Sequence, residues 1–137
     1  MWKWYALLSA LFAAVTALCA KAGVKDIDSN LATAIRVAFI LIITWGVVLV
    51  TGTAKDILGI TRSTWGFLAL SAVATGLSWL FYFKALQVGE VSKVAPLDKL
   101  SVPLAMLLAF LIFGESVTGY KIAGGLLITI GSLLLLK

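Results

Sequence analysis

The sequence predicts an all-α integral membrane protein, a bundle of five transmembrane helices, and three observations support this. Of the 137 residues, 62% are hydrophobic and 12% are charged, whereas a soluble domain is about 45–50% apolar and about a quarter charged. The mean hydropathy is +1.11 along the chain, and a disordered chain would show the opposite bias. Uninterrupted apolar runs such as 104–113 exclude the alternating pattern of a transmembrane barrel.

Five apolar segments are each long enough to cross the hydrocarbon core, which needs about 20 helical residues. They cover residues 4–22, 31–51, 65–86, 94–113 and 118–136. The first segment is expected to be a span and not a signal peptide, because its charged flank is only Lys3 and no soluble domain follows. The connections are short, so residues 1–137 are predicted to form a single transmembrane domain.

Residues at the ends of the first three segments suit a membrane interface or a helix cap. Aromatic residues at 2, 4 and 5 mark the first interface. Residues 23–30, with Lys25, Asp26, Asp28 and Ser29-Asn30, offer a turn and cap before the second helix. Ser63 or Thr64 is available to cap the third. These features support the predicted starting points of the helices.

The last two segments carry residues that alter helix geometry. Pro96 and Pro103 are expected to kink the fourth helix, because proline breaks the backbone hydrogen-bond ladder. The fifth helix is glycine-rich, which allows close backbone approach. We interpret it as a packing or dimer face, made of Gly124, Gly125, Thr129, Gly131 and Ser132.

Residue counts argue against several functions. There is no histidine, and Cys19 is the single cysteine, so a His/Cys metal site and a disulfide within the chain are excluded. Few catalytic constellations remain, and we expect neither an enzyme nor a cofactor. The basic residues are scattered, which is typical of membrane-flanking anchors and not of a nucleic-acid-binding surface.

The basic residues of the connections are balanced between the two sides of the membrane. The N-terminal side receives four and the opposite side four: Lys3, Lys55, Arg62 and Lys121 against Lys21, Lys25, Lys93 and Lys137. The positive-inside rule therefore has little bias to act on, although embedded basic residues weakly favour the second side as the inner one. We expect dual topology and an antiparallel homodimer. The alternatives are a single orientation with a parallel dimer or a monomer.

Four ionisable residues lie inside the predicted helix ends, namely Arg36, Lys84, Asp98 and Lys99. A charge in a span costs about 2.5–3.5 kcal/mol on insertion scales and therefore indicates a function. Alternate connections share a side, so all four approach the same side and are candidates for one charged vestibule. Alternatively, the two lysines extend to the headgroups, and Asp98 pairs with a basic residue.

Polar and aromatic residues of the second and third helices complete the candidate substrate pathway. Ser71, Thr75, Ser78 and Tyr82 share one helix face, with Trp79 at its border. Thr44 and Trp45 lie inside the second helix. The alternative is that the stripe makes interhelical hydrogen bonds and close packing.

Residues 85–97, ALQVGEVSKVAPL, resemble the junction of the third and fourth helices in EamA domains of the drug/metabolite transporter superfamily. The similarity continues through Pro103, Gly114-Glu115 and the glycine-rich segment 124–132. Most such relatives have two repeats of opposite topology. The resemblance therefore implies that this single-repeat, five-helix form dimerises into a ten-helix assembly.

The resemblance implies a transporter of small polar metabolites or drug-like molecules that works by alternating access. The expected partners of this protein are the lipid bilayer, a second copy of the chain and a small-molecule substrate, with no nucleic acid. The protein is expected to lie in a prokaryotic inner membrane. The four-helix multidrug-resistance branch uses an acid in its first helix, which this chain lacks. A non-transporting subunit of a hetero-assembly and a flippase for a lipid-linked group remain alternatives.

Overall fold

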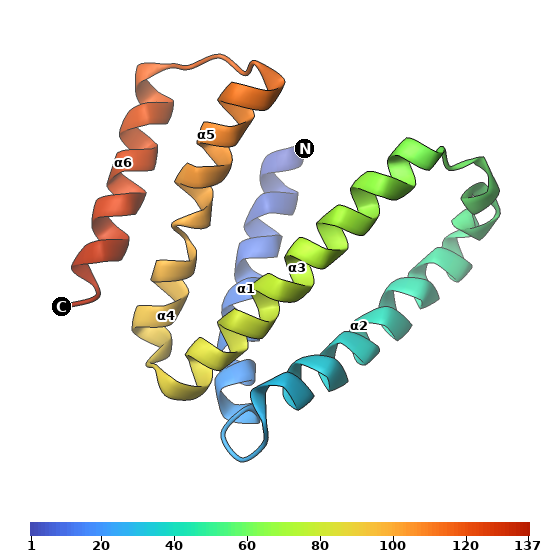
Figure 1. Ribbon diagram of the computed structural model, residues 1–137, viewed down its shortest axis with the longest axis horizontal. Helices are drawn as coiled ribbons and strands as arrows, with labels where there is room; N and C mark the ends of the chain where they lie inside the picture. The colour runs from blue at the N-terminus through green and yellow to red at the C-terminus, as the bar shows by residue number, and fades with distance from the viewer. The chain divides into compact units, whose positions relative to one another are not determined.

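The computed structural model describes residues 1–137 and is helical with no strands, which confirms the predicted all-α membrane class. Its elements are drawn in Figure 1. In chain order they are α1 (Trp2–Gly23), α2 (Ser29–Thr51), the short 3-10 helix η1 (Thr53–Gly59), α3 (Arg62–Val88), α4 (Val91–Asp98), α5 (Ser101–Phe113) and α6 (Gly119–Leu134).

Four stretches are apolar and long enough to cross a membrane: α1, α2, α3 and the combined segment Val91–Phe113. The fifth apolar helix, α6, has 16 residues, which at about 1.5 Å per residue is shorter than the hydrocarbon core of about 30 Å. Apolar residues continue after it at Leu135 and Leu136. The protein is therefore a multi-pass integral membrane protein whose helices contact the lipid bilayer.

Local chemistry sets the starts of α2 and α3. The Asp28 carboxylate accepts hydrogen bonds from the backbone N–H groups of Asn30 and Leu31, at 2.9 and 3.1 Å. At α3, Thr61 Oγ1 accepts from the backbone N–H of Thr64 at 3.2 Å. The cap thus comes from Thr61 and not from Ser63 or Thr64, because α3 begins at Arg62, before the predicted start.

The fourth span is interrupted at Lys99 and Leu100, between α4 and α5. Pro103 lies four residues after Lys99, so it has no N–H to donate to the Lys99 carbonyl, and its ring crowds that carbonyl. The Lys99 carbonyl instead accepts from the Val102 N–H at 3.0 Å. Pro96 lies inside α4 without ending it. The interruption therefore follows the position of Pro103.

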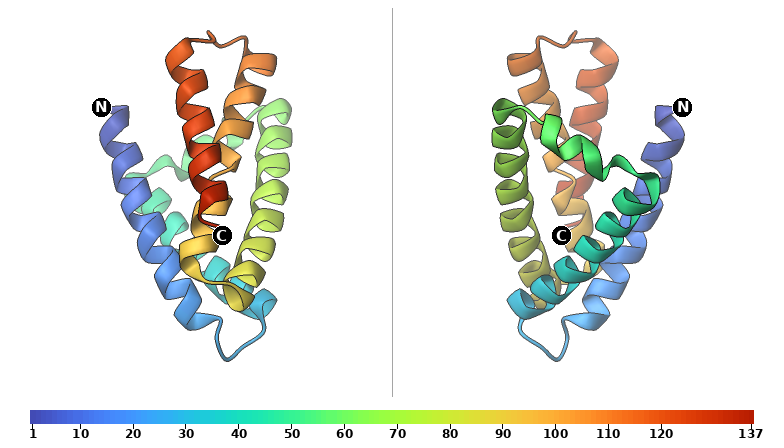
Figure 2. Two further views of the ribbon diagram at one scale, coloured as in Figure 1. Left: turned by 90° about the vertical axis from the view of Figure 1, so that its left-hand side faces the viewer. Right: turned by 90° about the vertical axis from the view of Figure 1, so that its right-hand side faces the viewer.

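The chain forms two compact units, which are described separately. One unit comprises Met1–Cys19 and Val88–Lys137, and the other comprises Ala20–Gln87. In the first unit, α5 and α6 run in opposite directions from their short connection (Figure 2). Gly125 of α6 is buried, and a Cβ added to it would lie 3.8 Å from the Pro103 Cβ. A Cβ at this position would lie in ordinary van der Waals contact with α5, so a side chain larger than that of alanine would press against that helix.

The α5–α6 connection is closed by a few specific contacts. Gly114 ends α5 with a φ of 62°, a left-handed conformation that glycine adopts without a steric penalty. Lys121 Nζ donates to the Ser116 carbonyl at 2.9 Å and lies 3.6 Å from a Glu115 carboxylate oxygen. The same ammonium lies 5.6 Å from the centre of the Phe110 ring. The Gly-Glu pair therefore forms a turn that Lys121 holds in place.

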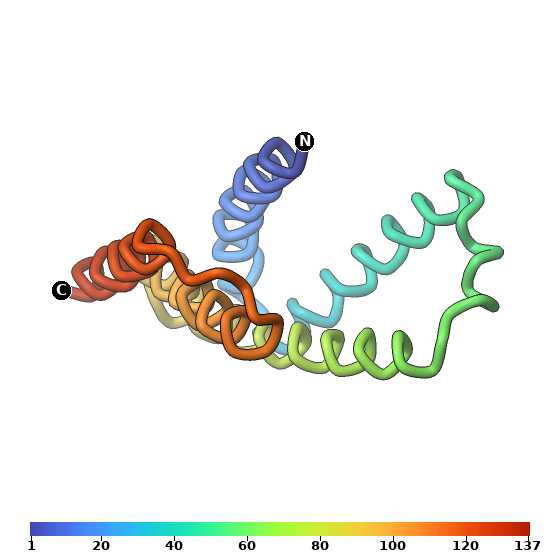
Figure 3. The backbone as a smooth tube through the Cα atoms, turned by 90° about the horizontal axis from the view of Figure 1, so that it is seen from above, coloured from blue at the N-terminus to red at the C-terminus, as the bar shows by residue number.

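In the second unit, α2 and α3 are joined by η1 at one end (Figure 3). They diverge toward η1 and come together at the opposite end, where α2 begins and α3 ends. The most buried apolar side chains of this unit lie at that closed end, with Val24 1%, Phe83 2% and Leu86 0% exposed. The closed end is therefore the packed part of the unit.

Candidate functional site

Two polar side chains tie the end of α1 and the α1–α2 loop to the end of α3, and we call Lys21 and Gln87 the loop clamp. Lys21 Nζ donates to the Leu86 carbonyl at 2.7 Å, so it satisfies a carbonyl in the last turn of α3 that lacks a helical partner. Gln87 Nε2 donates to the carbonyls of Val24 and Ile27, at 3.1 and 2.9 Å. The clamp holds the closed end of the unit together.

In the same unit, Arg36 of α2 lies against two aromatic rings of α3. Its guanidinium carbon is 4.6 Å from the centre of the Trp79 ring and 5.0 Å from that of Phe83. Trp79 and Phe83 are four residues apart, so they lie on one face of α3. We call these three residues the arginine–aromatic cluster.

The arginine–aromatic cluster contains a cation without an anionic partner from α2 or α3, since neither helix has an aspartate or glutamate. Arg36 is half-buried, and its Nη1 is buried without a hydrogen-bond partner. Each cation–π contact contributes about 0.5–2 kcal/mol. The guanidinium group also has five N–H donors, and an aromatic face does not replace the oxygen acceptors that these donors need. The cluster therefore holds a cation whose hydrogen-bonding capacity is not filled by α2 or α3.

The polar stripe of α3 begins beside this cluster. Tyr82 is half-buried, whereas Ser71, Thr75 and Ser78 are exposed on the chain. The stripe thus presents hydroxyl groups from a helix that is long and apolar enough to cross the membrane. Hydroxyl groups in a span normally face protein or water and not lipid.

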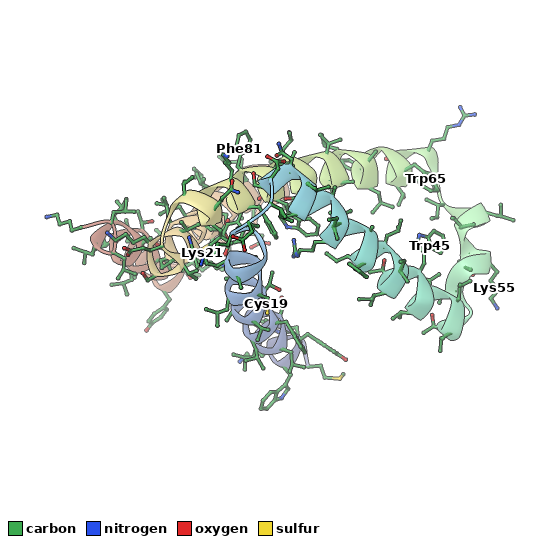
Figure 4. All side chains as sticks on the ribbon, turned by 90° about the horizontal axis from the view of Figure 1, so that it is seen from below. Cys19, Lys21, Trp45, Lys55, Trp65 and Phe81 are labelled. Atoms are coloured by element: carbon green, nitrogen blue, oxygen red, sulfur yellow. The ribbon has the colours of Figure 1, made fainter.

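The candidates on α2 differ from one another in their surroundings. Thr44 Oγ1 donates to the Ile40 carbonyl of its own helix at 2.8 Å, so its hydroxyl is satisfied locally. Trp45 is 45% exposed, and Figure 4 shows it on the side of α2 that faces α3.

On α3, Lys84 is exposed and donates to Gln87 Oε1 at 3.2 Å. Lys84 therefore bonds to one residue of the loop clamp.

Asp98 and Lys99 belong to the other unit and form their own ion pair. Lys99 Nζ lies 3.3 Å from an Asp98 carboxylate oxygen, and both side chains are partly exposed. Neighbouring residues inside a helix point to different faces, but α4 ends at Asp98, and Lys99 takes the capping position. The end of the helix lets the two side chains meet.

The structure places the candidate packing residues of α6 in different environments. Gly125 and Ser132 are buried, Gly124 and Thr129 are half-buried, and Gly131 is exposed. Thr129 Oγ1 donates to the Gly125 carbonyl at 2.9 Å. Part of this face is thus used within the chain, against α5.

Sequence reasoning missed three residues of the second unit: Phe83, Lys21 and Gln87. Phe83 is one of many apolar residues in a span, and nothing in the sequence distinguishes it from the others. Lys21 has the pattern of an ordinary membrane-flanking lysine. Gln87 carried the one usable signal, because a long amide side chain next to a helix end often bonds to backbone groups of a neighbouring segment.

Comparisons with known proteins agree with the architecture described above. The model of the EamA-like transporter family matches residues 1–137. The chain is 46% identical over 134 residues to a Sinorhizobium sp. protein described as an uncharacterized transporter in the cobO 3' region. That match covers 98% of this chain and 95% of the relative. No solved structure matches this chain.

The resemblance seen at the junction of the third and fourth helices is confirmed by the match over the full chain. Membership in this family makes the protein a membrane transporter, which is a role distinct from that of an enzyme. The four membrane-length stretches and the shorter α6 fit a membrane protein of this kind. The chain belongs to the EamA-like transporter family.

Proposed function

We propose that this transporter moves small polar metabolites or drug-like molecules by alternating access, as an antiparallel homodimer in a prokaryotic inner membrane. The observation that carries the proposal is the combination of Arg36 with the exposed stripe Ser71, Thr75 and Ser78 on membrane-length helices of one unit. Such groups are costly in lipid and suit a water-accessible pathway. The α2 and α3 faces that carry them are the proposed pathway surface.

The proposed pathway surface consists of residues of different character. The hydroxyl groups offer hydrogen bonds, the two tryptophans offer flat apolar contact, and the basic groups offer positive charge. From α2 and α3 it takes Arg36, Thr44, Trp45, Ser71, Thr75, Ser78, Trp79, Tyr82 and Lys84. In the other unit, the Asp98–Lys99 pair is a second candidate, in which Asp98 would be a charge partner or a proton carrier.

A second copy is proposed because the pathway surface is exposed on the single chain. Trp45 remains 45% exposed within the span of α2. The basic residues of the connections are equal in number on the two sides of the membrane, so insertion in both orientations is expected. Two opposed copies of five helices would reproduce the inverted repeats of larger transporters.

Alternating access requires a joint within a helix, and the break between α4 and α5 is the proposed joint. Discontinuous helices are common where transporters bind substrate or move. The Lys99 carbonyl and the backbone around it are bonded by short-range contacts and not by a regular helical ladder. Such a segment can bend at lower cost than a continuous helix.

The antiparallel arrangement is tested with C-terminal reporters that are active on opposite sides of the membrane. Signal from both reporters is expected, in comparable amounts. Signal from one reporter alone would refute the antiparallel homodimer. It would leave the proposal of a transporter with a single orientation unaffected.

Transport itself is tested by flux into liposomes containing only this protein. A panel of amino acids, organic cations and sugar phosphates is first screened by ligand-induced thermal shift, and the hits are used as solutes. Flux by the wild type, reduced in Asp98→Asn, is expected. No flux for any binding solute would favour a non-transporting subunit.

A further inference from the structure

We propose that the arginine–aromatic cluster is an anion-recognition site, which takes the carboxylate or phosphate group of a small organic anion. The inference rests on the proposed function, since it names the substrate class of the same pathway surface. The proposed anion site consists of Arg36, Trp79 and Phe83 alone. All three lie in one unit of the structure.

The position of Arg36 argues against a side chain that merely reaches toward the headgroups. It is seven residues after the start of α2 at Ser29, about 10 Å along the helix axis. Its guanidinium lies over Trp79 and Phe83, which are nine and five residues before the end of α3 at Val88. The charge is therefore held against the neighbouring helix, inside both spans.

The two rings orient the guanidinium without neutralising it. They contact the cation at 4.6 and 5.0 Å, while the Nη1 atom is buried without a hydrogen-bond partner. Neither helix contains a carboxylate, and Asp28, the acid nearest in sequence, caps α2. The missing partner is an acceptor with negative charge.

Guanidinium geometry decides which anion is suitable. Its planar set of N–H donors matches the two oxygens of a carboxylate or phosphate, and Arg is favoured over Lys where such paired recognition is needed. The adjacent Trp79 and Phe83 rings suit an apolar or planar group attached to that anion. The same chemistry is offered by a soluble organic anion and by the phosphate of a lipid headgroup.

Binding is measured on the full chain in nanodiscs of phosphatidylcholine by isothermal titration and tryptophan fluorescence. The probes are phenyl phosphate, benzoate and inorganic phosphate, with benzylammonium as the matched cation. The two aromatic anions are expected to bind and to perturb the fluorescence, and benzylammonium is not. Binding of benzylammonium in preference to both aromatic anions would overturn the proposal.

Substitution of Arg36 separates charge from geometry. Arg36→Gln should weaken phenyl phosphate binding by about tenfold or more, the loss of a charged hydrogen bond. Arg36→Lys keeps the charge and serves if the glutamine variant does not fold, and it should weaken binding less. Lys55→Gln, on exposed η1, is the control and should bind as the wild type does. Unchanged affinity in both Arg36 variants would overturn the site.

A second arm identifies the source of the anion. Nanodiscs containing phosphatidylglycerol are analysed for lipid retained by the protein in native mass spectrometry. Retention that is lost in Arg36→Gln, with no binding of soluble anions, would assign the site to a lipid phosphate. Soluble binding without such retention would assign it to a substrate. Neither binding nor retention would overturn the proposal.

The binding assay and the flux assay fail independently. A protein that binds phenyl phosphate through Arg36 but moves no solute would overturn the transport proposal and keep the anion site. A protein that moves organic cations and binds no anion would overturn the anion site and keep the transport proposal.

Discussion

Individual polar side chains determine how the second unit is held together. Its fully buried apolar residues are few, and Leu86 and Val24 are the most enclosed of them. Around them, the loop clamp of Lys21 and Gln87 satisfies three backbone carbonyls. A buried carbonyl left without a partner is costly, so these two residues are expected to matter more than their exposure suggests.

Replacement of Gln87 tests the loop clamp. Gln87→Leu removes two hydrogen bonds to the carbonyls of Val24 and Ile27 and should lower the free energy of unfolding by about 1–3 kcal/mol. The measurement is reversible unfolding in mixed micelles. Lys84→Met, which loses one exposed hydrogen bond to Gln87, is the matched control and should cost about 0–1 kcal/mol. Equal effects of the two variants would contradict the clamp.

At the scale of elements, proline and glycine shape the last third of the chain. Pro103 coincides with the break between α4 and α5, and its Cβ lies opposite the position where Gly125 lacks one. The same proline therefore interrupts one helix and forms part of the surface against which the next helix packs. The Thr129 hydroxyl bonds to the Gly125 carbonyl, which adds a local contact on that face.

Pro103→Ala tests the break in the fourth span. The variant regains a backbone N–H for the Lys99 carbonyl, so α4 and α5 should join into a more continuous helix. Hydrogen exchange at residues 99–104 is expected to slow by at least about tenfold, which corresponds to about 1.4 kcal/mol of added local stability. Pro96→Ala, inside α4, is the comparison and should leave exchange at these residues nearly unchanged. Faster exchange in Pro103→Ala would refute the assignment.

The contact of α6 with α5 is tested by two neighbouring glycines. A Cβ at Gly125 meets Pro103 and Met106 at 3.8–3.9 Å, whereas one at Gly124 meets nothing within 4 Å. Gly125→Leu should destabilise the chain by about 1–3 kcal/mol through overpacking. Gly124→Leu should change stability by no more than about 0.5 kcal/mol.

Oligomer size is measured on the same two glycine variants. Loss of the dimer in Gly124→Leu, at unchanged stability, would place that glycine in the interface between copies. If both variants were equally destabilised, the packing of α6 on α5 through Gly125 would be wrong.

For the whole molecule, we expect orientation in the membrane to depend on charges and not on packing. Basic residues in short connections control insertion, and acidic residues contribute little. Lys25 in the α1–α2 loop and Lys55 on η1 are both exposed, and they belong to connections on opposite sides. Each is therefore expected to affect orientation with little effect on folding.

Lys25→Ala and Lys55→Ala should shift the ratio of the two C-terminal reporters in opposite directions, by about twofold or more, since each removes one of four basic residues on its side. Asp56→Asn is the control and should leave the ratio unchanged. A shift in the same direction for both lysine variants would contradict orientation by charge balance.

The sequence by itself determined the membrane class, the five apolar helices and the family. Composition and run length report burial in lipid directly, without knowledge of which helices meet. It also indicated Arg36, because a charge inside a span is costly wherever it lies, and Trp79, because this residue borders the polar stripe of the third helix. Only the tertiary structure decided what Arg36 touches, and that Phe83 and not another apolar residue completes the cluster. It also decided that Lys21 and Gln87 bond to carbonyls 60 to 65 residues away in the chain. Such contacts depend on how helices pack, and in a span where almost every residue is apolar, the hydrophobic pattern does not specify which face meets which neighbour.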